Sequence, residues 1–108
     1  MEMNIAKSGV WTVITASGEI DLHHSTDLRV EAIRHLDAGE DVLLHMAGVG
    51  YLDSSGIAAL AQSLAHARKL ERKLALAEPS EAVTRILRLT RLDSVFATYP
   101  SVAEAPGA

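Results

Sequence analysis

The stretch DVLLHMAGVGYLDSSGIAAL, residues 41–60, joins a nearly continuous apolar run to a segment with helical periodicity. The apolar run over 41–49 is typical of a central strand that is covered on both faces. From Ser55 to about Leu70, apolar residues recur every three or four positions, which predicts a helix with one apolar side. An acidic residue, two hydroxyls and a glycine lie between the two elements. We therefore predict a strand that passes through a short polar turn into a helix.

Strand-like and helix-like segments also alternate before this unit. Residues 3–7 and 10–20 indicate two strands that form an opening hairpin, because Gly9 between them can take a positive φ. A helix is then expected to begin near Ser25, a plausible N-cap, and to end at Gly39.

The same alternation continues to the end of the chain. A buried strand is expected over 72–79, a short helix over 80–90 and an edge strand over 94–100, and the last residues, 101–108, are expected to form a frayed tail. Strands that alternate with helices imply right-handed crossovers and a largely parallel sheet. We therefore predict a single α/β domain over residues 1–108. Its sheet is mixed, largely parallel and of about five strands, opened by the hairpin, and it carries three to four helices.

Composition narrows the classes of function. The chain has 108 residues, of which 48% are hydrophobic and 22% charged, which is enough for one domain with an aliphatic core. It contains no cysteine, which excludes disulfides and thiolate chemistry and fits the cytoplasm. No segment has the ~20 apolar residues that insertion into a bilayer requires. The net charge of −4 disfavours direct binding to nucleic acid.

The polar turn holds more hydroxyl and carboxyl groups than a helix N-cap needs. Either Asp53 or Ser54 can cap the helix by accepting hydrogen bonds from its first free N–H groups. A neighbouring hydroxyl is then left free at a surface turn, the place where ligands usually bind in parallel sheets. Gly56 removes a side chain next to that hydroxyl, which lets another backbone approach.

Ser54 does not fit the pattern of a catalytic nucleophile. The serine elbow of hydrolases has glycine two residues before and after the serine, and Leu52 occupies the first of these positions. No histidine is placed by the sequence as a base for Ser54 or as part of a metal site. The histidines are His23, His24, His35, His45 and His66. We therefore expect a protein that is not an enzyme, with no catalytic residue, metal site or cofactor.

Ser54 is better placed to receive a phosphoryl group. Phosphorylation adds a charge of about −1.5 to −2, and the N–H groups and dipole of a helix N-terminus accept such a charge without unfolding the helix. A partner that presses an acidic group to about 4 Å from the phosphate would be repelled by on the order of 4 kcal/mol. Since that energy is roughly a thousandfold in affinity, the turn has the chemistry of a binary switch.

The sequence resembles the STAS domain family, specifically the bacterial anti-sigma factor antagonists. The resemblance covers nearly the whole chain and rests on the ordered motifs SGEID at 17–21, VGYLDSSGIAAL at 49–60 and RLDSVFATYPSVAEA at 91–105. In that family the serine directly after the motif's Asp is phosphorylated by the anti-sigma factor, a serine kinase of the histidine-kinase-like ATPase class. The resemblance thus implies phosphorylation of Ser54, with Ser55 as the second candidate.

The resemblance also implies partner switching in transcription regulation. The unphosphorylated protein binds the anti-sigma factor and frees a sigma factor, phosphorylation releases it, and a metal-dependent serine phosphatase resets it. Asp21 matches a family Asp beside the site, and it either positions the serine or the kinase's nucleotide or serves as a turn residue. Asp53 either orients the Ser54 hydroxyl or caps the helix, and Ser55 is a cap or contact residue.

The expected partner surface comprises the turn up to Gly56, the outer side of the following helix and the loop before the first helix. Its other residues are His23, His24, Ser25, Gln62, Ser63 and His66. STAS domains also serve as cytoplasmic subunits or regulators of transporters, either ABC systems of the phospholipid-trafficking type or anion transporters. There the same helix face binds an ATPase without phosphorylation. The hydroxyl of Ser54 favours the phosphorylation switch, because a purely structural subunit does not need it.

Overall fold

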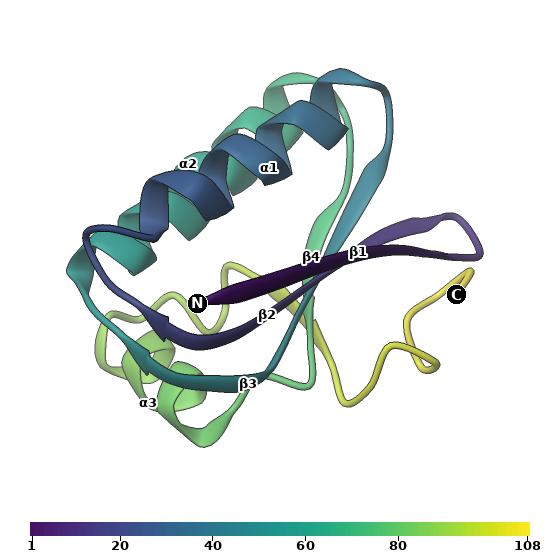
Figure 1. The fold of residues 1–108 in the computed structure, drawn as a ribbon. Coiled ribbons are helices and arrows are strands. Elements are labelled where there is room, and N and C mark those ends of the chain that lie inside the picture. The colour runs from purple at the N-terminus through teal and green to yellow at the C-terminus, as the bar shows by residue number, and fades with distance from the viewer.

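A five-stranded sheet with three helices makes up the computed structural model, which describes residues 1–108 (Figure 1). The elements in chain order are β1 (Glu2–Ser8), β2 (Trp11–Ile20), α1 (Ser25–Asp37), β3 (Asp41–Leu52), α2 (Ser54–Lys69), β4 (Leu74–Ala77), α3 (Glu81–Leu89) and β5 (Ala97–Tyr99). The strands lie in the sheet in the order of the sequence. β1 is antiparallel to β2 and every later neighbour pair is parallel. The predicted α/β class, opening hairpin and largely parallel sheet are confirmed.

All three helices contribute to one core on the same side of the sheet. α1 and α2 lie side by side, and α3 packs near the end of β3 (Figure 1). The buried apolar residues of this core that come from helices are Leu28, Ala32 and Leu36 in α1, Leu60, Leu64 and Ala67 in α2, and Val83 and Leu87 in α3. Their spacing of three or four residues is the pattern that predicted the helices.

The opposite face of the sheet is covered by the C-terminal segment. Ala105 is buried there in a cluster with Trp11 and Leu43, and the Trp11 indole Nε1 donates to the Pro106 carbonyl at 2.8 Å. The expectation that residues 101–108 form a frayed tail is therefore wrong. The segment is held because it covers apolar strand residues that no helix reaches.

The opening turn and the C-terminal segment depend on each other. Gly9 has φ 58°, which favours glycine. A Cβ at Gly9 would also lie 1.7 Å from the Gly107 carbonyl oxygen, which accepts a hydrogen bond from the Val10 N–H at 2.9 Å. Glycine is thus required at this turn by both the local backbone and the contact with the chain end.

Several element boundaries differ from the sequence prediction, including those of β4, which spans only Leu74–Ala77. β3 extends beyond 49 to Leu52, because its last residues stay paired with β2, up to Ile20 opposite Leu52. β5 is shorter than predicted and spans only Ala97–Tyr99. The N-cap position of α1 is His24, without a side-chain cap, so the assignment of Ser25 as N-cap is wrong. Ser25 is instead buried as the first residue of the helix.

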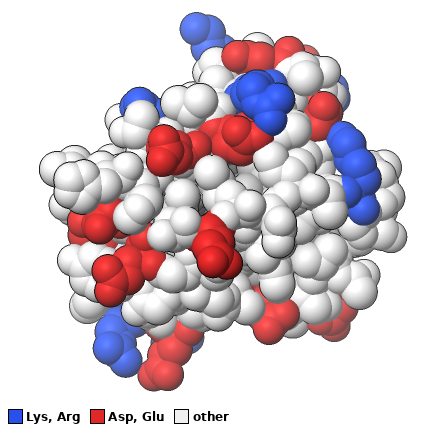
Figure 2. Space-filling view, in the orientation of Figure 1, with Lys and Arg blue, Asp and Glu red and all other residues white.

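Charged side chains are interspersed on the surface. On the face in Figure 2, basic side chains are separated by acidic and uncharged ones, and no basic surface spans several elements. No helix of the structure has the length and apolar character needed to cross a membrane.

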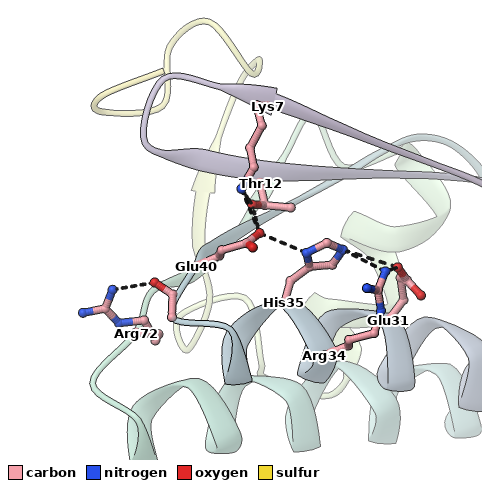
Figure 3. A network of polar contacts seen from close by, with 8 residues as sticks. Lys7, Thr12, Glu31, Arg34, His35, Glu40 and Arg72 are labelled. Carbon is pink, nitrogen blue, oxygen red and sulfur yellow. Dashed lines mark hydrogen bonds and ion pairs between the residues drawn. The ribbon is translucent and has the colours of Figure 1, made fainter.

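A polar network ties the amino ends of β2 and β3 to α1 and β1 (Figure 3). The Glu40 carboxylate accepts from Lys7 Nζ at 2.8 Å and from the Thr12 hydroxyl, and it contacts His35 Nδ1 at 2.9 Å. The hydrogen bond from Lys7, with those from Thr12 and His35, lowers the Glu40 pKa to about 2 against partial desolvation. The network lies at the end of the sheet away from the polar turn, so it stabilises the fold without touching that turn.

Candidate functional site

The polar turn lies where the parallel strands β2 and β3 end together. Ile20 and Leu52 are register partners at these ends, and the Asp53 N–H approaches the Ile20 carbonyl at 3.4 Å. The residues that follow, Asp21 and Asp53, therefore lie close together at the carboxyl edge of the sheet. Parallel pairing is what brings together two acidic residues 32 positions apart in the chain.

Asp53 is the N-cap of α2. Its Oδ1 accepts from the backbone N–H groups of Ser55 at 2.9 Å and Gly56 at 3.2 Å, and from the Ser55 hydroxyl at 2.5 Å. The Ser55 hydroxyl, with both N–H groups, holds the pKa of Asp53 below its usual range, although desolvation and the nearby Asp21 charge oppose this. The carboxylate and the Ser55 hydroxyl are thus both committed to the start of the helix.

Ser54 is the first residue of α2 and is exposed. Its hydroxyl makes no hydrogen bond within the chain, in contrast to that of Ser55. Of the two serines, only Ser54 presents a hydroxyl that is both exposed and uncommitted.

Gly56 is buried and fits α2 against the strand ends. A Cβ there would lie 2.2 Å from Leu52 Cδ1 and 3.2 Å from Ile20 Cγ2. The expectation that the glycine admits another backbone beside the hydroxyl is therefore wrong, because the space is filled by side chains of this domain. Gly56 acts through packing and sets how closely the Ser54 turn sits on the sheet.

Asp21 stands at the start of the β2–α1 loop and organises it. Its Oδ1 accepts from the His23 N–H at 3.0 Å and lies 2.7 Å from His24 Nδ1. Partial desolvation raises the pKa of Asp21, but the His23 N–H and the nearby His24 outweigh it and lower the pKa overall. Asp21 thus holds its own loop, as the turn-residue interpretation expects, while a role in positioning Ser54 or a nucleotide stays a prediction.

Comparison with known proteins identifies the family of this fold. A family model described as the STAS domain matches residues 2–105. The chain belongs to the STAS domain family. Similar solved structures include a putative anti-sigma factor antagonist from Thermotoga maritima (TM-score 0.88, 21% identity, 95% of this chain and 90% of that one). An anti-sigma factor antagonist from Mycobacterium paratuberculosis matches with a TM-score of 0.82 at 25% identity, over 96% of this chain and 89% of that one.

The fold is also similar to that of SpoIIAA, a Bacillus cell fate determinant solved in a phosphorylated form, with a TM-score of 0.75. The identity is 17%, over 96% of each chain. It also matches part of murine Slc26a9, an anion transporter, with a TM-score of 0.74 at 21% identity, over 93% of this chain and 18% of the transporter. The same fold therefore occurs both as a small protein and within a much longer one.

Part of the surface predicted around the turn of this STAS domain is exposed. His23 and Gln62 are at least partly exposed, and Gln62 Oε1 accepts from Arg29 at 2.8 Å. His24 and His66 are partly exposed, and His66 Nε2 lies 2.7 Å from Asp37 Oδ1. The loop before α1 and Gln62 thus form a polar surface near the turn, whereas His66 lies in the last turn of α2, about 18 Å along the helix from Ser54, and does not adjoin the turn.

Two residues assigned to this surface lie inside the domain. Ser25 is 5% exposed and Ser63 is 2% exposed, so their assignment to an exposed partner surface is wrong. The Ser63 hydroxyl donates to the Ala59 carbonyl at 2.8 Å within α2. That bond removes the need for water, which is why a serine can sit on the packed side of the helix.

Sequence analysis missed an apolar part of the same edge. Leu22 in the loop after β2, Tyr51 near the end of β3 and Leu89 at the end of α3 are 73%, 49% and 75% exposed. Tyr51 and Leu89 line one shallow hollow with Ile86. Large exposed apolar side chains of this kind often mark protein contacts. The signal in the sequence was Tyr51 beside Leu52, since neighbours on a strand face opposite ways and only one of them can enter the core.

Proposed function

We propose that this STAS domain is an anti-sigma factor antagonist that switches partners through phosphorylation of Ser54. The observation that carries the proposal is the exposed, uncommitted Ser54 hydroxyl at the first residue of α2. Anti-sigma factor antagonists with this fold, and the phosphorylated form of SpoIIAA, support it. The unphosphorylated protein then binds an anti-sigma factor and frees a sigma factor in the bacterial cytoplasm.

The capping geometry favours Ser54 over Ser55 as the phosphoryl acceptor. Phosphorylation of Ser55 would remove the hydroxyl hydrogen that Asp53 Oδ1 accepts at 2.5 Å and would place a dianion against that carboxylate. A phosphate on Ser54 leaves the three hydrogen bonds of the cap intact. The helix therefore persists in the phosphorylated state, and the change is confined to the surface.

The first N–H groups of α2 are less available to a phosphate than the sequence suggested. Ser55 and Gly56 already donate to Asp53, so a phosphate on Ser54 lies near the carboxylates of Asp53 and Asp21 without neutralising them. The turn then carries a concentrated negative charge. An acidic partner group at about 4 Å is repelled by on the order of 4 kcal/mol at an interfacial dielectric, which releases the partner.

The partner that fits is a serine kinase of the histidine-kinase-like ATPase class, which is itself the anti-sigma factor. A metal-dependent serine phosphatase resets the switch. In this proposal Asp21 and Asp53 hold the turn in the conformation that presents Ser54, and the kinase supplies the nucleotide. The contact surface combines the polar residues His23 and Gln62 with the exposed apolar residue Tyr51.

The alternative function is a transporter subunit or regulator whose partner is an ATPase. The match to part of an anion transporter supports this alternative. In that case the same surface binds the ATPase and Ser54 is never modified. The free hydroxyl of Ser54 is the feature that this alternative leaves without a use.

Incubation with the candidate kinase and ATP, followed by mass spectrometry, tests the switch. We expect one phosphate on the wild-type peptide that contains Ser54, none on the Ser54→Ala variant and one on the matched Ser55→Ala control. Ser54→Ala is expected to bind the kinase like the wild type, whereas Ser54→Asp binds at least about tenfold more weakly because a charge enters the contact. Phosphate on Ser55 alone, or equal kinase binding by all variants, would show that Ser54 is not the switch.

A further inference from the structure

A hollow of about 230 Å³ lies at the amino ends of β4 and β5, beside the C-terminal end of α2. It is far from the proposed switch, because α2 carries the chain roughly 20 Å from Ser54 to Arg68. Its lining is mostly apolar and includes two aromatic rings. The lining residues that the argument uses are Trp11, Leu74, Ala97 and Tyr99 with the three cations Arg68, Arg72 and Lys73.

The three cations of the hollow have no carboxylate partner. The ion pairs of the domain involve other basic residues. Arg68 Nη2 approaches the Val95 carbonyl at 3.4 Å, and Arg72 Nη1 donates to the Gly39 carbonyl at 2.9 Å (Figure 3). Each guanidinium therefore retains N–H groups for another acceptor. The nearby Asp41 carboxylate accepts from the Lys73 backbone N–H at 2.9 Å and does not line the hollow.

Helix electrostatics accounts for only one of these cations. Arg68 lies in the last turn of α2, where a positive charge stabilises the helix dipole. Arg72 and Lys73 lie beyond the C-cap Leu70, so the dipole gives no reason for placing them here. Lys69 is in the same basic run but does not line the hollow. The three cations therefore belong together because they surround the apolar hollow, and not only because they are close in the sequence.

We propose that this hollow binds a small organic anion that has an apolar or aromatic body. The body packs against the exposed Ala97 and the partly exposed Tyr99, where apolar surface is removed from water. The anionic group, a carboxylate or a chemically similar oxyanion, is held by Arg68 and Lys73 through charge-assisted hydrogen bonds. An inorganic anion would contact the cations but would leave the apolar lining exposed to water. The site is independent of the proposed switch at Ser54.

Titration with benzoate, followed by amide NMR spectra, tests the site. Trp11 is the single tryptophan of the chain, so its indole N–H gives an unambiguous signal in the lining. We expect saturable shifts at Trp11, Ala75, Ala97 and Tyr99, with no shifts around Ser54. Benzyl alcohol has the same ring without the charge, and acetate has the charge without the ring. Both are expected to bind at least about tenfold more weakly than benzoate.

Exposed-residue variants separate a built site from general charge attraction. The double variant Arg68→Ala/Lys73→Ala is expected to lose at least about tenfold in benzoate affinity while its amide spectrum stays dispersed. The Lys69→Ala control removes one charge from the same run and is expected to bind benzoate within about twofold of wild type, because screened charges outside the site contribute little. Benzoate shifts that do not saturate, equal binding of acetate, or equal losses in the double variant and the control would each overturn the proposal.

Discussion

Ser54 and Ser55 are neighbours of the same type in different chemical situations. The Asp53 cap engages the hydroxyl of Ser55 and leaves that of Ser54 exposed. The selectivity between them is therefore set by the geometry of a helix start, where the carboxylate can reach the second helical residue. Ser54 is therefore exposed, although the helix start that carries it is fixed by the Asp53 cap.

The turn depends directly on the absence of a side chain at Gly56. We expect Gly56→Ala to destabilise the domain by about 1–3 kcal/mol, because overpacking of a buried site costs energy of that order. The added methyl would overlap Leu52, since its carbon would lie 2.2 Å from Leu52 Cδ1. Urea unfolding of the wild type and the variant measures this difference.

A double variant tests whether the clash itself is the cause. Combining Gly56→Ala with Leu52→Ala removes the overlapping atoms, so the cost of the two changes together is expected to be smaller than the sum of their separate costs. Strict additivity would mean that Gly56 is required for its backbone conformation and not for packing.

At the scale of the helix, Asp53 combines a cap with a charge. Asp53→Ala removes both, whereas Asp53→Asn keeps a side-chain oxygen that can accept from the Ser55 and Gly56 N–H groups. We therefore expect Asp53→Ala to unfold at lower urea than Asp53→Asn. The folded-state pKa of Asp53 is depressed below 3.8, so its charge stabilises the fold above that pH and this advantage is lost as the pH falls below it. The advantage of wild type over Asp53→Asn should thus shrink in acid, and an advantage independent of pH would contradict the assignment.

At the level of elements, the network around Glu40 joins β1, β2 and α1 to the start of β3 (Figure 3). It gives the stability of the fold a second, larger pH dependence. The pKa of Glu40 falls from 4.5 to about 2 on folding. The stabilisation is therefore complete above about pH 4.5 and is lost as the pH falls towards 2.

We expect Glu40→Gln to cost about 1–3 kcal/mol near neutral pH, because hydrogen bonds to a charged acceptor are lost. The difference from wild type should decline steadily below about pH 4.5. Urea unfolding across this range measures it, with Glu2→Gln as the control, since Glu2 is exposed and forms no ion pair. If the unfolding free energies of wild type and Glu40→Gln changed in parallel with pH, Glu40 would not be a cause of the loss of stability in acid.

At the scale of the whole molecule, local patterns were predictable and spatial neighbours were not. Periodicity located the unit around residues 41–60 because a strand face and a helix stripe are properties of consecutive residues. The burial of Ser63 depends on the packing of α2 onto the rest of the domain, and a polar residue gives no sign of this in the sequence. The same holds for Ala105, which is buried only because the sheet face near Trp11 lies beside it.

The C-terminal segment offers the clearest test at this scale, because composition alone predicts a tail and the structure shows a cover. Removing residues 103–108 deletes the hydrogen bonds from Trp11 to Pro106 and from Val10 to Gly107, together with the buried Ala105. At about 0.5–1.5 kcal/mol for each hydrogen bond and a similar amount for the buried methyl, the loss is about 1.5–4.5 kcal/mol.

Trp11 reports on this loss directly, since it is the only tryptophan and is 2% exposed in the intact fold. Its emission is expected to shift to longer wavelength in the truncated chain, because water reaches the indole, and urea unfolding should occur at lower concentration. Ala103→Ser is the matched control, because Ala103 is an exposed residue of the same segment and its change should alter neither signal. If truncation left both the emission and the unfolding midpoint unchanged, the segment would not be the cover of this face, and the sheet around Trp11 would have to be stable while exposed to water.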